Sequence, residues 1–79
     1  MSWRDVPTAD YILFLADWKS RQEIAVKFNL SNVESWHCVK FLSKLSEIQV
    51  IKGSGFTKRC ILYKARCFAL QEARESKSL

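Results

Sequence analysis

Two helix-starting signals lie eleven residues apart in the stretch Ser20-Arg21-Gln22-Glu23-Ile24-Ala25-Val26-Lys27-Phe28-Asn29-Leu30-Ser31-Asn32-Val33-Glu34. Each is a capping box: a Ser hydroxyl can accept from the backbone amide three residues on, while the Glu at that position reaches back to the cap amide. Asn29 stands where a left-handed residue would end the first helix, and Leu30 can pack back onto it. The spacing leaves room for a helix of about eight residues, a turn of about three and a second helix, which is a helix-turn-helix unit.

Helical periodicity extends to both sides of this unit. Apolar residues recur near helical spacing from Ala9 to Trp18, and Thr8 is the expected N-cap of that first helix. The third helix is expected to run from about Asn32 to Leu45. Its predicted buried stripe consists of Cys38, Phe41, Leu42 and Leu45. The opposite face holds Asn32, Val33, Trp36, Lys40, Ser43 and Lys44.

The pattern changes from helical to strand-like after Glu47. The run Ile48–Lys52 is rich in β-branched residues, and Phe56–Lys64 resembles a second strand. Gly53-Ser54-Gly55 can supply the positive φ of a tight hairpin turn between them. We expect this wing to pack on the helices, because a two-stranded ribbon is unstable alone. Ala65–Glu75 is expected to form a fourth helix that either closes the core or pairs two subunits.

These elements predict an α+β fold, a winged helix-turn-helix with three helices, a two-stranded β-hairpin wing and a C-terminal helix. The 79 residues allow one domain over 1–79, with a core over about residues 8–64 and a C-terminal helix and tail over 65–79.

The formal net charge of +5 is concentrated in one segment. Residues 1–39 carry four basic and five acidic side chains, whereas residues 40–66 carry seven basic side chains against Glu47 alone. Such an asymmetry indicates a polyanionic partner.

Fold and charge together favour double-stranded DNA as the partner. The second helix of a helix-turn-helix enters the major groove, where Asn can read adenine and Lys can reach guanine or phosphate. Basic residues of the wing would bind the phosphate backbone. For any one of these residues, an ordinary solvated surface position is at least as good an explanation as DNA binding. The predicted DNA-binding residues are Asn32, Trp36, Lys40, Ser43, Lys44, Lys52, Lys58 and Arg59.

Trp36 is unusual on a face that reads bases, and Val33 projects with it while Val39 lies at the edge. Three roles are open for its ring: folding back to fill the elbow between the two helices, contacting a protein, or contacting a base. We rank them in that order. A protein contact ranks above a base contact because aromatic anchors dominate the energy of protein interfaces.

The sequence offers no chemistry for catalysis or for a cofactor. The three cysteines, Cys38, Cys60 and Cys67, form no CxxC pair, and His37 adds no metal-ligand spacing. They are expected to be reduced core residues. No nucleophile motif, carboxylate pair or phosphate-binding loop is present, so we expect no enzyme activity. The lack of a membrane span or signal sequence predicts a cytoplasmic protein.

The chain resembles the winged-helix transcriptional regulators of bacteria. The resemblance covers residues 9–64 and rests on Ser31-x6-Cys38-x2-Phe41-Leu42-x2-Leu45, followed by Ile48 and a basic Gly-containing hairpin. The runs 11–18 and 21–25 look more narrowly similar to small enterobacterial regulators of fimbrial and carnitine operons. The resemblance implies a sequence-specific regulator of transcription, of a kind often encoded on mobile or phage-derived DNA.

A second function stays open beside DNA binding. Winged helices also serve as protein-interaction modules. In that role the chain would be an inhibitor or adaptor that binds a protein partner through Val33, Trp36 and the C-terminal segment.

Overall fold

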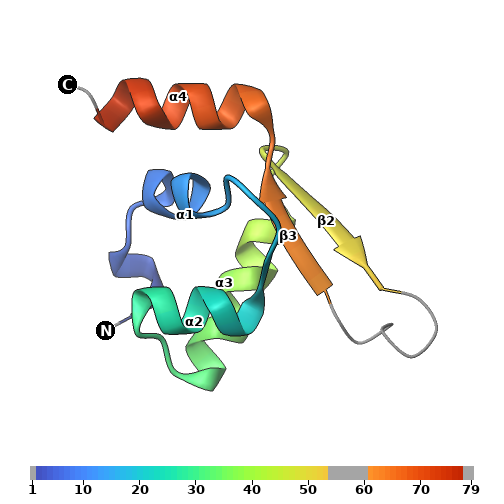
Figure 1. The fold of residues 1–79 in the computed structure, drawn as a ribbon. Helices are drawn as coiled ribbons and strands as arrows, with labels where there is room; N and C mark the ends of the chain where they lie inside the picture. The colour runs from blue at the N-terminus through green and yellow to red at the C-terminus, as the bar shows by residue number, and fades with distance from the viewer. Residues whose placement is uncertain (1, 54–60, 78–79) are drawn as a thin grey trace.

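The computed structural model describes residues 2–53 and 61–77, in which helices pack beside a small antiparallel sheet (Figure 1). The elements in chain order are the 3-10 helix η1 (Trp3–Asp5), α1 (Thr8–Phe14), β1 (Lys19–Ser20), α2 (Arg21–Phe28), α3 (Asn32–Ser43), β2 (Ile48–Lys52), β3 (Ile61–Ala65) and α4 (Cys67–Lys77). This order confirms the predicted α+β winged helix-turn-helix.

The first capping box forms as the sequence predicts. The Ser20 hydroxyl accepts from the Glu23 amide at 3.3 Å, and the Glu23 carboxylate accepts from the Ser20 amide at 3.1 Å. Helix α2 ends at Asn29, which has a left-handed φ of 54°. Leu30 is buried, and its amide donates to the Ala25 carbonyl at 2.9 Å. The turn into α3 is therefore fixed by local chemistry at both of its ends.

The second capping box is only half formed, so that part of the prediction is wrong. The Ser31 hydroxyl accepts from the Glu34 amide at 3.1 Å, as expected. The Glu34 carboxylate instead accepts from the Trp3 amide at 2.9 Å, because η1 packs against α3. The Trp3 ring lies 5.2 Å from the Phe41 ring between centroids. Glu34 thus ties the N-terminal segment to α3.

Helix α1 is shorter than predicted and begins differently. Pro7 occupies the N-cap position and Thr8 is the first helical residue, so the assignment of Thr8 as N-cap is wrong. The helix stops at Phe14 rather than at Trp18. The Leu15 carbonyl accepts from the Ala65 amide at 2.8 Å. This tertiary hydrogen bond occupies the carbonyl oxygen that a longer helix would use as a backbone acceptor.

The sheet has three strands in the order β1-β3-β2, whereas the sequence predicted two. Strand β1 pairs Lys19 with Tyr63 and Ser20 with Leu62. Two residues are too short to show a period, and the sequence indicates only a helix cap at Ser20 and no element at Lys19. Strand β2 has the predicted bounds. Residues 54–60, which include most of the predicted turn and the start of the second strand, lie outside the described residues.

Helix α4 closes the core rather than trailing from it, and Figure 1 shows it beside α1. Its buried residues are Ala69, Leu70 and Ala73, which join the main apolar cluster with Tyr11 and Leu15. The core therefore extends beyond residue 64. Phe68 remains 49% exposed, and the pairing of two subunits through this segment stays a prediction.

We expect Asn29→Ala to lower the free energy of unfolding by about 1–2 kcal/mol, because a Cβ-bearing residue without a local polar side chain is strained at positive φ. Asn29→Gly is the matched control, since glycine takes this conformation without strain. Urea unfolding of the two variants measures the difference. Equal losses in both would show that the backbone conformation is not the cause.

Candidate nucleic-acid interface

The outward face of α3 gathers most of the predicted DNA-binding residues. Asn32, Trp36, Lys40, Ser43 and Lys44 are all exposed, as are Val33 and His37. Their spacing of three to four residues places them along one side of the helix. Cys38, Leu42 and Val39 are buried on the other side. The assignment of Val39 to the edge of the outward face is therefore wrong, because α3 turns this side chain into the core.

The outward face of α3 carries cations and no acid. Glu34 is the one acidic residue of this helix, and it is half-buried against the Trp3 amide. Lys40 in the last turn and Lys44 at the C-cap stand without an acidic neighbour on their own helix. The face therefore presents a positive field to solvent, as binding to a polyanion requires.

The remaining predicted residues differ in how the structure places them. The Ser43 hydroxyl donates to the Lys40 carbonyl at 2.9 Å, so its hydrogen is engaged within the helix and its oxygen can act outward as an acceptor. Lys52 ends β2 and is exposed. Lys58 and Arg59 lie outside the described residues, and their contribution to a wing stays a prediction.

Arg21, the first residue of α2, belongs to this face although sequence reasoning assigned it no functional role. Its Nη1 donates to Asn32 Oδ1 at 3.0 Å and to Ser35 Oγ at 2.7 Å. Its Cζ lies 4.2 Å from the centroid of the Trp36 ring, within the range of a cation–π contact. No local pattern signals these contacts, because they join different helices across the turn.

The structure decides part of the question about Trp36. The ring is 52% exposed, so the expectation that it fills the elbow between the helices is wrong. Its contact with α2 is the Arg21 guanidinium. Arg21 is half-buried, so the stack sits where α2 and α3 meet the solvent and leaves about half of the Trp36 side chain exposed. Trp36 is therefore available to a partner, as is Val33 at 63% exposure.

Cys38 is a small core residue, as the sequence predicted. It is fully buried, and burial raises the pKa of its thiol, which keeps it protonated. Burial likewise raises the pKa of its neighbour Tyr11, whose hydroxyl donates to the Trp3 carbonyl at 2.6 Å. Cys67 is exposed at the start of α4, so the expectation that it is a core residue is wrong. Cys60 lies outside the described residues. Within residues 2–53 and 61–77 no group of three or more His, Cys, Asp or Glu side chains could hold a metal ion.

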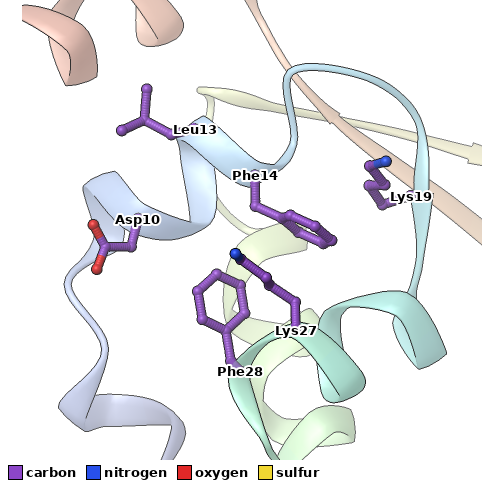
Figure 2. Close-up of a pocket in the computed structure, with 6 residues that line it drawn as sticks. All are labelled: Asp10, Leu13, Phe14, Lys19, Lys27 and Phe28. Atoms are coloured by element: carbon purple, nitrogen blue, oxygen red, sulfur yellow. The ribbon is translucent and has the colours of Figure 1, made fainter.

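A shallow groove of about 640 Å³ lies between α1 and α2 (Figure 2), and none of the residues predicted to bind DNA lines it. Figure 2 shows Phe14 and Phe28 among its lining residues, and their rings pack edge to face with 5.6 Å between the ring centroids. Lys19 Nζ lies 5.3 Å from the Phe14 centroid. The groove is lined by two basic residues, Lys19 and Lys27, by the acidic Asp10 and by apolar side chains, so its charge does not favour one class of ligand.

Comparison with known proteins identifies the fold. No protein-family model and no curated protein matches the chain. Solved structures of ZitR from Lactococcus lactis do match it. A double mutant matches with a TM-score of 0.71 and 20% sequence identity, and a single mutant with a TM-score of 0.70 and 21% identity. The double mutant in its apo form matches with a TM-score of 0.70 and 20% identity. Each match covers 89% of this chain and 48–53% of the ZitR chain. The chain thus has the winged-helix fold and spans about half the length of these proteins.

The described part of the chain contains no helix that is both long and apolar enough to cross a membrane.

Proposed function

We propose that this protein is a DNA-binding regulator of transcription, with α3 in the major groove and the basic wing on the phosphate backbone. The observation that carries the proposal is the α3 face itself. Its polar and basic residues are exposed on one side of the second helix of a helix-turn-helix, and the acid of that helix is held away from them. This arrangement fits the way such helices enter the groove.

The likeness to ZitR supports the proposal at the level of the fold. ZitR is a winged-helix transcription regulator, and at 20–21% identity the likeness reaches no further than the fold. The narrower resemblance to enterobacterial fimbrial and carnitine regulators gains no support from the comparisons. We therefore propose a regulator of the wider winged-helix superfamily. Pairing of two copies through the α4 segment, where Phe68 is exposed, would suit a palindromic site.

Fluorescence anisotropy of a labelled random-sequence duplex, titrated at two salt concentrations, tests the proposal. We expect a Kd of roughly 10⁻⁴ to 10⁻⁶ M near physiological salt, which tightens as salt is lowered because phosphate contacts release counterions. If no salt-sensitive binding is seen even at tens of micromolar protein, the proposal is wrong.

A protein-interaction module is the second candidate, and the exposure of Val33 and Trp36 favours it. These apolar side chains are 63% and 52% exposed on a helix whose other neighbours are polar or basic. An aromatic anchor of this kind suits a protein interface, with the lysines around it facing an acidic partner.

The variant Trp36→Ala separates the two candidates. Because the ring is half exposed, we expect the fold to survive its removal. A protein module would lose partner capture while any DNA affinity stayed unchanged. A DNA-binding regulator would lose DNA affinity instead. Anisotropy and pull-down on the same preparation give both readouts.

A further inference from the structure

Arg21 fixes how Asn32 faces a partner. A guanidinium group can only donate hydrogen bonds, so the Asn32 amide must turn its oxygen toward Arg21 Nη1, 3.0 Å away. The amide nitrogen Nδ2 then lies on the other side of the amide group. Asn32 is exposed and Arg21 is half-buried, so Arg21 holds the Asn32 amide from the side that faces away from a bound partner.

Arg21 is itself held by a buried group. Ser35 is fully buried, and its hydroxyl accepts from Arg21 Nη1 at 2.7 Å while donating to the Asn32 carbonyl at 2.7 Å. A charge-assisted hydrogen bond to a buried oxygen is stronger than its neutral counterpart. Both hydrogens of Nη1 are therefore committed within the protein, and the guanidinium has one preferred position beside the Trp36 ring.

This geometry disfavours the adenine contact that the sequence alone suggested. Reading adenine through both of its groove atoms requires an amide that offers its oxygen and its nitrogen side by side. Here Arg21 occupies one lone pair of the oxygen and turns it toward α2, which leaves the Nδ2 donor as the group that Asn32 presents most freely to DNA. Lys40 and Lys44 on the same face also donate only, and Arg21 keeps N–H groups on Nε and Nη2 besides those of Nη1. The Ser43 oxygen can accept, but it lies eleven residues further along α3 than Asn32, so donors predominate around Asn32. Guanine presents two acceptors in the major groove, whereas adenine presents one acceptor and one donor.

We propose that Arg21 is a positioning residue that sets the base preference of the α3 face, by holding Asn32 as a donor so that the face selects guanine over adenine. This inference rests on the proposed DNA binding and adds to it which base edge is read and which residue outside α3 decides it.

Selection from a pool of randomised duplexes, followed by anisotropy on matched guanine and adenine sites, tests this inference. For the wild-type chain we expect enrichment of guanine at one or more positions. Arg21→Lys keeps the charge but loses the paired hydrogen bonds of Nη1, so discrimination between guanine and adenine should fall roughly tenfold, given that a good base contact contributes about 1–3 kcal/mol. The salt dependence of binding should stay as in the wild type, because the charge is unchanged.

Two further variants separate this role from a loss of folding or of charge. Ser35→Ala removes the buried hydroxyl that holds Arg21 and leaves the exposed surface intact, so it should relax base preference in the same direction. Lys27→Ala removes a cation from the same helix, at the groove of Figure 2, and should leave base preference unchanged. Thermal unfolding checks that each variant is folded at the assay temperature.

The outcomes distinguish the two proposals. If the wild-type chain shows no salt-sensitive DNA binding, both are overturned. If it binds DNA but selects adenine, or no base, the inference that the α3 face selects guanine is wrong while the proposed function stands. If Arg21→Lys and Ser35→Ala both keep the guanine preference of the wild type, Arg21 does not set it.

Discussion

Replacing Lys40 and Lys44 together with alanine should weaken binding to a random-sequence duplex on the order of 50-fold at 0.1 M salt. Each phosphate that a lysine neutralises contributes about 0.9 to the slope of log K against log salt, so two contacts amount to a slope change of about 2. Both lysines are exposed at the C-terminal end of α3, and α3 itself places no acid beside them. Their loss should therefore act on affinity and leave the fold intact.

Anisotropy at several salt concentrations measures the slope directly. The matched control is the double variant Lys19→Ala and Lys27→Ala, which makes the same change in net charge at the groove between α1 and α2. A specific interface on α3 predicts a small effect of the control pair. If both double variants weaken binding equally, the attraction is a property of net charge alone and α3 is not the contact surface.

The local signals of the sequence were enough for the helix-turn-helix. Ser20 and Glu23 satisfy each other within four residues, and Asn29 ends α2 through its own backbone conformation. Such interactions depend on neighbours in the chain, so a single sequence contains them in full. The same holds for most of the α3 face, because helical periodicity alone places Lys40 and Cys38 on different sides of the helix, although it put Val39 on the wrong side.

Three of the errors arise where a distant segment competes for a local group. Glu34 leaves its capping box for the Trp3 amide, 31 residues away in sequence. The Leu15 carbonyl bonds to the Ala65 amide, and α1 ends early. Strand β1 exists because β3 lies beside it, and two residues carry no period of their own. Tertiary packing overrides local preference in each case.

In the candidate site, too, local features could be predicted from the sequence and tertiary contacts could not. Exposure of the α3 residues followed from their spacing, but the direction of the Asn32 amide did not. That direction depends on Arg21, which approaches from another helix. A sequence pattern can place a residue on a face, whereas the hydrogen-bond partners that orient it come from the fold.

Leu42→Ala should cause a large loss of stability. Leu42 lies on the inner side of α3, has no exposed surface and belongs to the cluster that includes Ile24 of α2 and Ile48 of β2. Removing a fully buried leucine side chain costs about 2–5 kcal/mol through lost burial and the cavity left behind. A domain of this size has roughly 4–12 kcal/mol in total. Thermal unfolding should show a Tm lower by roughly 10–30 °C.

Val33→Ala is the matched control on the same helix, since its side chain is 63% exposed and its loss should change the free energy of unfolding by less than about 0.5 kcal/mol. The pair also tests how packing and binding are connected. Leu42 and the outward residues share one helix, and they face opposite ways. Below its lowered Tm, Leu42→Ala should therefore keep the salt dependence of DNA binding seen in the wild type. A changed slope in a folded sample would mean that core packing also sets the position of α3 on the duplex.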